Sequence, residues 1–346
     1  MLAVMSKKEK FDQYKDLGLT GMANLGNTCF INSVLQCISH TYELNDFLNK
    51  ETYKTKLNKI PESLLLIEWD KLRKLMWSEN CIIKPAGFIN AVQKVAHLKD
   101  KDIFTGYAQN DLTEFMNFLF SSFHEAIKRE VEMNIKGDAK NDTDELAIIC
   151  FNMMKTMYKN EYSEFLKLFY GISVSEIKSL ESNYKNITPE PFFNIDLSID
   201  NANSLESCLE QYTTNEIMDG DNKILNDETK NKEKASKRIM FWSLPDILII
   251  TLKRFSNNNR KNNKKISFPL TNLNMSKYVL GYEKDSYKYD LFGICNHSGG
   301  VNGGHYTSFV KNANNKWYHF NDTRVSLINI SNLQTEAAYC FFYRKQ

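Results

Sequence analysis

Long hydrophobic runs are missing from this sequence. The longest apolar stretch, residues 247–252, has the length of a β-strand and is too short to cross a bilayer. The first ten residues offer only a short apolar opening before charged side chains appear, so we expect no signal peptide. The sequence therefore predicts a soluble, intracellular protein without a membrane partner, located in the cytoplasm with the nucleus as a second compartment.

An excess of either charge is also missing. The 346 residues include 44 lysines and arginines against 42 aspartates and glutamates, a formal net charge of +2. This balance gives no strong attraction to nucleic acid or to a membrane surface, and we expect neither as a partner. The seven cysteines are odd in number and follow no regular spacing, which favours a reducing compartment over a disulfide scaffold.

The sequence does contain enough apolar side chains for a large core. Hydrophobic residues make up 42% of the chain and aromatic residues 12%, which argues against disorder. Helical spacing is typical of the first half and strand-like alternation of the second, and no internal repeat is visible. We expect a polar lead-in over residues 1–17, followed by a single domain over residues 18–346.

One stretch has the features of a nucleophile site. Residues 18–28 are rich in glycine and asparagine, and from Phe30 onward the apolar residues recur at helical spacing. Cys29 therefore stands where a loop becomes a helix, which we expect to run to about Phe47. The positive end of the helix dipole favours a thiolate, so we expect a lowered pKa of Cys29. Loop amides and the Asn24 side chain can form an oxyanion hole. The alternative is an ordinary buried cysteine.

A cysteine nucleophile needs a histidine base that a third group holds in place. Of the six histidines, His305 stands out because it follows two glycines and begins a strand-like run. A polar turn at 312–315 separates this run from a second one at 316–320. Folding this hairpin places His305 opposite Asn321 or Asp322, and the strand register decides which of the two shares its face.

The two segments resemble the Cys box and the His box of the ubiquitin-specific proteases, the papain-like deubiquitinases. The stretches that match the family pattern are, in chain order, 26–33, 107–115, 244–255, 303–306 and 320–322. The resemblance extends over residues 18–344 and implies an α+β, papain-like cysteine protease fold of the ubiquitin-specific protease type. It also implies three subregions: a helical thumb at about 18–158, β-ribbon fingers at about 159–240, and a β-sheet palm at about 241–346 together with 190–200.

The resemblance implies a deubiquitinating cysteine protease that hydrolyses the peptide or isopeptide bond after the last glycine of ubiquitin. Cys29 is then the nucleophile, and His305 is the base. Asn321 orients His305, with Asp322 as the alternate orienter. Asn24 and the Cys29 backbone amide are expected to stabilise the oxyanion. The reaction passes through a thioester, and we expect no metal and no organic cofactor.

A channel for the ubiquitin tail is implied by the same resemblance. Gln109, Asp111 and Glu114 stand at the start of an amphipathic pattern over residues 111–127, where acidic groups also complement the helix dipole. They match positions that grip the arginines of the tail. The other expected tail contacts are Phe268, His297, Gly303, Gly304 and Tyr306. The glycines beside His305 leave room for a diglycine strand. A phosphate-binding loop is the rival interpretation of such a glycine-rich segment, but such a loop would be followed by the start of a helix with Lys-Ser/Thr, and none follows here.

The region of the expected fingers departs from the family pattern. Many relatives carry two Cys-x-x-Cys pairs there, which coordinate zinc. The corresponding positions in this sequence are occupied by Ser179, Ser182, Leu225 and Glu228. Only Cys208 lies nearby, and one thiolate does not make a tetrahedral site. We therefore predict fingers without zinc, and a mobile loop over the mixed-charge run 226–238.

Two other classes of function stay open. The chain can be a ubiquitin-binding module without activity, or a papain-like peptidase with another substrate, such as another ubiquitin-like modifier. A ubiquitin probe with an electrophilic C-terminus separates an enzyme from a module. Comparing modifiers that end in the same two glycines separates the substrates. The partners we expect are ubiquitin and ubiquitinated proteins, and we expect a monomer.

Overall fold

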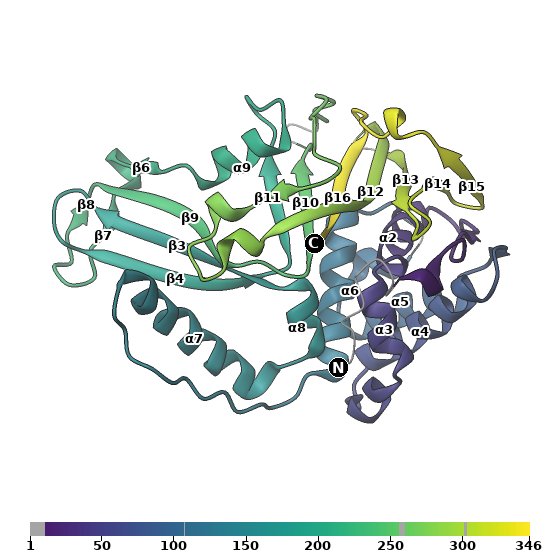
Figure 1. The fold of residues 1–346 in the computed structure, drawn as a ribbon, viewed down its shortest axis with the longest axis horizontal. Coiled ribbons are helices and arrows are strands. Elements are labelled where there is room, and N and C mark those ends of the chain that lie inside the picture. The colour runs from purple at the N-terminus through teal and green to yellow at the C-terminus, as the bar shows by residue number, and fades with distance from the viewer. Residues whose placement is uncertain (1–10, 107, 256–259, 301–302) are drawn as a thin grey trace, which may run out of the picture. The chain divides into compact units, whose positions relative to one another are not determined.

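Two structural units divide the chain, and each is assembled from segments that are distant in the sequence. The computed structural model describes residues 11–106, 108–255, 260–300 and 303–346 (Figure 1). The first unit contains residues 1–128, 249–267 and 291–343, and the second contains residues 129–248, 268–290 and 344–346. The expected boundaries of thumb, fingers and palm differ from this division, and they stay a prediction.

Helices make up most of the N-terminal part of the first unit. They are α2 (Cys29–Ser39), α3 (Tyr42–Asn49), α4 (Glu62–Ser78), α5 (Ala86–Leu98) and α6 (Leu112–Ile127). α4 packs against both α5 and α6. The apolar stripe of α6, which includes Leu112, Phe115 and Leu119, is fully buried. This confirms the amphipathic helix predicted from the spacing of its apolar residues.

The sheet of the first unit has the strand order β15-β14-β13-β12-β16-β10. Its strands are β15 (Arg324–Ile328), β14 (Trp317–Asn321), β13 (Gly303–Lys311), β12 (Lys288–Gly300), β16 (Ala338–Lys345) and β10 (Ile247–Lys253). β13 pairs antiparallel with both β12 and β14. Between β13 and β14, Asn312 N donates to Lys316 O at 3.0 Å, and Asn315 has a φ of 65°. The predicted hairpin with its polar turn is therefore confirmed.

α2 is buried along its whole length. It packs against β13, β14 and α6, and Figure 1 shows its purple ribbon beside the yellow-green strands. A helix covered on all sides has apolar residues around its whole circumference, and its polar side chains need partners. Ser33 Oγ donates to Thr307 O at 2.9 Å, and Gln36 Nε2 donates to Thr20 O at 2.8 Å. These bonds tie α2 to β13 and to the segment that precedes the helix.

The helix that begins at Cys29 is shorter than expected. α2 ends at Ser39 and α3 begins at Tyr42, so the prediction of one helix to about Phe47 is wrong. The side-chain amide of Asn45 donates to Ser39 O at 2.7 Å. In a continuing helix, the Ser39 carbonyl would accept a hydrogen bond from a backbone amide. Here it accepts from the Asn45 side chain instead, and α2 ends at Ser39.

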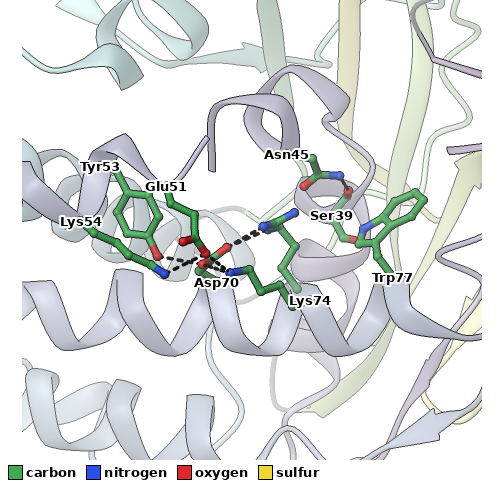
Figure 2. A network of polar contacts seen from close by, with 9 residues as sticks. Ser39, Asn45, Glu51, Tyr53, Lys54, Asp70, Lys74 and Trp77 are labelled. Atoms are coloured by element: carbon green, nitrogen blue, oxygen red, sulfur yellow. Dashed lines mark hydrogen bonds and ion pairs between the residues drawn. The ribbon is translucent and has the colours of Figure 1, made fainter. Parts of the chain in front are cut away.

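A buried ion pair lies on α4. Arg73 Nη2 is 2.6 Å from Asp70 Oδ1, and the two side chains are 3% and 4% exposed. Tyr53 OH donates to Asp70 Oδ2 at 2.8 Å. Lys74 Nζ lies 3.3 Å from Asp70 Oδ2 and 2.6 Å from Glu51 Oε1, and Figure 2 shows these side chains converging above the helix. Both oxygens of Asp70 are thus compensated, which a buried carboxylate requires.

The second unit contains a sheet with the strand order β4-β3-β9-β6. The main helices and strands of this unit are, in chain order, α7 (Asp142–Glu161), α8 (Glu164–Phe169), β3 (Gly171–Ser179), β4 (Lys185–Phe192), β5 (Asn194–Ser198), α9 (Leu205–Thr213), β6 (Glu216–Met218) and β9 (Ala235–Ser243). α7 packs Ala147 and Cys150 against Ile172, Val174 and Trp242. This cluster is the core that joins the long helix to the ribbon of β3, β4 and β9.

A short hairpin lies where we predicted a mobile loop. β7 (Ile224–Leu225) pairs with β8 (Lys232–Glu233), and Ala235 at the start of β9 pairs with Ser179 of β3. Between β7 and β8, Asn226 N donates to Asn231 O at 2.9 Å. The prediction of a loop is therefore wrong for residues 232–233 and 235–238, which lie in β8 and β9, whereas residues 226–231 connect β7 and β8 as a turn.

Candidate active site

Cys29 is the first residue of α2, and 2% of its surface is exposed. The loop before it takes its shape from Asn24, whose Oδ1 accepts hydrogen bonds from Thr28 N at 3.0 Å and Gly26 N at 3.1 Å. Gly26 and Asn27 have φ angles of 101° and 55°, which glycine and asparagine adopt most readily. The glycines and asparagines of the loop therefore serve to turn the backbone sharply into the helix.

The pKa of the Cys29 thiol is raised, so the expectation of a lowered pKa is wrong. Burial is the largest cause, and the negative charge of Asp322 acts in the same direction. Hydrogen bonds from the backbone amides of Tyr306, Phe30 and Cys29 itself lower the pKa. The amides that the loop-to-helix position predicts are thus present, but the loss of hydration outweighs them. In the unliganded chain the group is a thiol at neutral pH.

His305 lies in β13 and contacts Asn321 at the end of β14. Its Nε2 is 2.7 Å from Asn321 Oδ1. Because a carbonyl oxygen accepts, Nε2 carries the hydrogen and Nδ1 keeps the lone pair that can take a proton. Ser308 pairs with Phe320, and this register puts His305 and Asn321 on one face of the sheet and Asp322 on the other. Of the two orienters left open, the structure places Asn321 against His305.

The first turn of α2 lies against the part of β13 that carries His305. The amide of Tyr306, the residue after His305, hydrogen-bonds to the sulfur of Cys29. Ser33, one turn further along α2, donates to Thr307 O at 2.9 Å. Among the described residues, no hydrogen bond joins Cys29 Sγ directly to the His305 ring. Cys29 thus lies against the residue that follows His305, and the roles of nucleophile and base stay predictions.

Asp322 connects the turn after β14 to the loop before α2. Its Oδ1 accepts from Asn32 Nδ2 at 2.8 Å, and its Oδ2 accepts from Asn24 Nδ2 at 3.0 Å. Its backbone oxygen accepts from Met22 N at 2.9 Å. An amide nitrogen carries two hydrogens, so one hydrogen of Asn24 stays available for a substrate oxygen. Asp322 therefore acts on the expected oxyanion residue and does not touch His305.

Gln109 makes a two-point contact with Gly304. Its Nε2 donates to Gly304 O at 2.6 Å, and its Oε1 accepts from Gly304 N at 2.8 Å. A Cβ atom on Gly304 would lie 2.2 Å from His297 Nε2, so the packing requires glycine at this position. On Gly303 the nearest atom to an added Cβ is Gln109 Oε1 at 3.7 Å, an ordinary contact. The two predicted glycines therefore differ: Gly304 is needed sterically, whereas Gly303 is not.

The two acidic residues at the start of α6 differ in their surroundings. Asp111 is the N-cap, and its Oδ1 accepts from Thr113 N at 2.8 Å. Its Oδ2 accepts from Tyr339 OH at 2.8 Å, so both oxygens have partners. Glu114 is exposed, and within the described ranges its carboxylate has no partner. Glu114 is therefore the carboxylate at this end of α6 that is ready to bind a cation.

His297 and Tyr306 belong to a buried aromatic cluster that also contains Tyr339. The ring centroids of His297 and Tyr306 are 4.6 Å apart, and those of Tyr306 and Tyr339 are 6.2 Å apart. Burial and the charge of Lys261 lower the pKa of His297 to about 4, so this ring is neutral at pH 7. The sequence analysis missed Tyr339, because nothing in its strand-like C-terminal run distinguishes it from a core aromatic residue.

Phe268 is the predicted tail contact that falls in the second unit. Its side chain is buried, with 3% of its surface exposed. The other predicted tail residues all belong to the first unit. A role for Phe268 in binding the ubiquitin tail stays a prediction.

Proton transfer from a thiol needs a neutral imidazole whose second nitrogen is held by an acceptor, and His305 meets this requirement through Asn321. Together with Cys29 at the start of a buried helix, this is the arrangement of the papain-like cysteine hydrolases. The family model described as "Ubiquitin carboxyl-terminal hydrolase" matches residues 20–343. The chain belongs to this family, and its α+β fold is that of the ubiquitin-specific protease catalytic domain.

Individual relatives agree with this assignment. Ubiquitin carboxyl-terminal hydrolase 2 of Bos taurus is 30% identical over 343 residues, covering 94% of this chain and 55% of the relative. The protein of the same name from Gallus gallus is 32% identical over 344 residues, covering 94% of this chain and 93% of that relative. This chain thus spans 55% of the length of the bovine relative.

Solved structures with the same fold include one described as "Structure of the SAGA Ubp8/Sgf11/Sus1/Sgf73 DUB module bound to ubiquitin aldehyde". It matches with a TM-score of 0.73 and 26% sequence identity, covering 97% of this chain and 71% of that chain. A further structure of the same module matches with a TM-score of 0.67 and 26% sequence identity, covering 97% of this chain and 69% of that chain.

Proposed function

We propose that this chain is a deubiquitinating cysteine protease that hydrolyses the peptide or isopeptide bond after the C-terminal glycine of ubiquitin. The observation that carries the proposal is the 2.7 Å contact between His305 Nε2 and Asn321 Oδ1, which leaves Nδ1 as the base for Cys29. The names of the relatives support the substrate class, and so does the ubiquitin aldehyde on the structural neighbour.

The first half-reaction transfers the ubiquitin acyl group to sulfur. His305 Nδ1 removes the Cys29 thiol proton while the sulfur attacks the carbonyl carbon, and the carbonyl electron pair moves onto oxygen. The Cys29 amide and the Asn24 hydrogen that Asp322 does not use stabilise this oxyanion. When the oxyanion collapses, the C–N bond breaks, and the imidazolium gives its proton to the departing lysine amine. The product is a thioester.

Water completes the cycle. His305 Nδ1 takes one proton from a water molecule as its oxygen attacks the thioester, and the sulfur leaves with the C–S electron pair. The imidazolium then returns the proton to sulfur, which regenerates the thiol and the neutral base. The raised pKa of Cys29 in the unliganded chain supports a deprotonation that accompanies the attack.

The tail of ubiquitin would approach past the start of α6 and the β12–β13 hairpin. We propose that Glu114 binds an arginine of the tail, since its carboxylate is exposed and unpaired in the described ranges. Asp111 can bind an arginine only if its Oδ2 gives up the hydrogen bond that it accepts from Tyr339 OH. Gln109 and Gly304 would release one another so that the diglycine strand can pair with their polar groups. His297, Tyr306 and Gly303 complete the proposed channel in the first unit, and a contact of Phe268 with the tail stays a separate prediction.

A ubiquitin probe with an electrophilic C-terminus tests this function. We expect the probe to label the wild-type chain at Cys29, and we expect Cys29→Ala to bind ubiquitin without being labelled. Cys81→Ala is the matched control, because Cys81 is partly exposed and the other cysteines are buried. Ubiquitin binding without labelling of the wild-type chain would establish the non-catalytic module instead. Faster labelling by a probe built on another modifier would reassign the substrate.

Ubiquitin and ubiquitinated proteins are the partners we propose, with the chain acting as a monomer; light scattering during gel filtration tests the oligomeric state. The described ranges contain no helix that is both long and apolar enough to span a bilayer. We propose a cytoplasmic location with the nucleus as a second compartment, which fractionation of cells that express the chain tests.

A further inference from the structure

One buried carboxylate in the second unit is surrounded by hydrogen-bond donors. Glu233 ends β8, and 7% of its surface is exposed. Ser179 Oγ and Ser182 Oγ donate to its Oε2 at 2.5 Å and 2.6 Å. Asn226 Nδ2 donates to its Oε1 at 2.7 Å, and Thr229 Oγ1 lies 3.4 Å from the same oxygen. Four side chains thus converge on a single anion.

The four donors form two pairs with the same spacing. Ser179 and Ser182 are three positions apart at the turn after β3, and Asn226 and Thr229 are three positions apart at the turn after β7. Two such pairs, one on each of two turns, have the spacing of a Cys-x-x-Cys zinc site in which four thiolates converge on one cation. In this chain the charges are opposite to those of a zinc site, because four hydrogen-bond donors surround the Glu233 carboxylate, an anion.

The first member of each pair also shapes its own turn. Ser179 Oγ accepts hydrogen bonds from Glu181 N and Ser182 N, both at 3.0 Å. Asn226 Oδ1 accepts from Glu228 N at 2.9 Å and from Thr229 N at 3.2 Å. Each turn is therefore closed locally and presents its two donors to Glu233 in the same way.

The residues present do not fit zinc. Three hydroxyls and an amide offer neither the thiolates nor the imidazoles that zinc prefers. No cluster of three or more His, Cys, Asp or Glu side chains suited to a metal ion occurs among the residues that the structure describes. At the two positions predicted to correspond to the second pair, Leu225 is 52% exposed and takes no part in the cluster, and Glu228 is exposed; the donors are Asn226 and Thr229.

We propose that the Glu233 carboxylate holds the two turns of this ribbon tip together in place of a metal ion. It is the only group that all four donors share in the described part of the tip. Ser182 and Thr229 are exposed, whereas Asn226 is 1% exposed, so without the carboxylate the buried Asn226 amide would lose its 2.7 Å acceptor. The tip therefore needs no zinc, and it depends on Glu233 being ionised.

Six other ionisable groups around the tip form three pairs, and Lys230 and Lys232 are exposed. The pairs are Glu181 Oε1 with Lys223 Nζ at 3.2 Å, Asp219 Oδ2 with Lys234 Nζ at 2.8 Å, and Asp227 Oδ2 with Tyr184 OH at 3.2 Å; Glu228 is exposed. Hydrogen bonds, first from Ser179 and then from Ser182, hold the pKa of Glu233 below its ordinary value of 4.5. Because folding lowers the pKa of Glu233, its ionised form stabilises the fold at every pH above the ordinary pKa. This stabilisation is lost as the pH falls through the lowered pKa of the folded state.

Hydrogen exchange of the backbone amides in residues 179–184 and 224–235 tests the carboxylate. Glu233→Gln keeps the size of the side chain but turns one acceptor oxygen into a donor that faces other donors. We expect exchange in these segments to become at least about tenfold faster, while β12, β13 and β14 stay protected. Glu228→Gln, in the same turn, is the matched control and should leave exchange unchanged. Unchanged exchange in Glu233→Gln overturns the proposal.

Metal analysis tests the second half of the proposal. We expect elemental analysis of the purified chain to show no stoichiometric zinc, and a chelator to leave exchange at the tip unaltered. One zinc per chain, whose removal speeds exchange, overturns the proposal. The combined variant Ser179→Cys, Ser182→Cys, Asn226→Cys, Thr229→Cys and Glu233→Ser should bind about one zinc, with chelator-sensitive protection. If it folds and binds none, the four positions do not share a centre. These readouts are independent of hydrolase activity.

Discussion

Asp322 accepts a hydrogen bond from the Asn24 amide at 3.0 Å, although the two residues are 298 positions apart in the sequence. The carboxylate takes one hydrogen of this amide, which leaves the other for the oxyanion contact proposed above. The same negative charge helps to raise the pKa of Cys29. Asp322 thus holds the Asn24 amide and opposes a resting thiolate at Cys29, and both effects come from its place beside the loop before α2.

Asn24 and Asp322 should act as one unit. We expect Asn24→Ala to lower kcat by about 10²–10³-fold, the usual loss when one oxyanion donor is removed, with KM little changed. Asp322→Ala should cause a similar loss, because the amide is then free to rotate. The double variant should be no slower than the slower single variant. Steady-state cleavage of ubiquitin carrying a C-terminal fluorophore measures this, and fully multiplicative losses would show that the residues act separately.

The bond between His305 and Asn321 predicts a difference between two substitutions at position 321. Asn321→Ala removes the acceptor that fixes the tautomer, and we expect kcat to fall by about 10²-fold or more. Asn321→Asp keeps an acceptor and adds a negative charge that favours the imidazolium. Most activity should remain, and the acid limb of the kcat/KM profile should move to higher pH, because neutral His305 is the base. An acid limb that stays in place contradicts this geometry.

The raised pKa of Cys29 can be measured by alkylation. In the unliganded chain, we expect iodoacetamide to react slowly with Cys29 at pH 7, because the thiolate is the reactive form and burial disfavours it. The rate should rise with pH and still be rising at pH 9, the ordinary value from which this pKa is shifted upward. Mass spectrometry of the modified peptide gives the rate. A plateau near pH 7 would indicate a thiolate–imidazolium pair instead.

The ion pair on α4 should contribute strongly to the stability of the first unit. Asp70→Ala leaves Arg73 buried without its partner, and we expect a loss of about 3–5 kcal/mol in the free energy of unfolding. Glu51→Gln is the control at the exposed edge of the network and should have a much smaller effect, because solvent screens that pair. Urea unfolding followed by the fluorescence of Trp69 and Trp77, which lie on α4, measures both.

Two neighbouring glycines should respond differently to the same substitution. Gly304→Ala places a Cβ atom 2.2 Å from His297 Nε2, so the strand beside His305 must move. We expect labelling by the ubiquitin probe to slow by about 10²-fold, a loss typical of an ångström-scale displacement at an active site. Gly303→Ala meets no such obstacle in the unliganded chain, so it should slow labelling much less than Gly304→Ala does. Equal effects would mean that the substitutions act through the backbone and not through His297.

Several local features of the fold follow from the sequence. The glycines and asparagines before Cys29, with helical spacing after Phe30, predict a loop that ends in a helix at the nucleophile, and α2 begins there. The polar turn between two strand-like runs predicts the β13–β14 hairpin. The spacing over residues 111–127 predicts α6 and its buried stripe. Each depends on residues close in the chain, whose preferred backbone angles and apolar periodicity act locally.

Other features depend on contacts that no local pattern contains. The strand register, and not the composition of the turn, puts Asn321 on the face of His305 and sends Asp322 toward Asn24. The break after Ser39 comes from a side-chain bond that competes with the helix. The convergence of Asn226 and Thr229 on Glu233 was not predicted, because serine, asparagine and threonine have no zinc-ligand signature.

The sequence by itself therefore determined the family and singled out Cys29 and His305, since these rest on short segments whose residue types are specific; the roles of nucleophile and base stay predictions. Only the tertiary structure decided the direction of the Cys29 pKa shift, because burial by the sheet and by α6 removes more hydration than the helix amides replace. It also decided which group occupies the ribbon tip, because Ser179 and Glu233 are 54 positions apart and meet only when the two turns fold together.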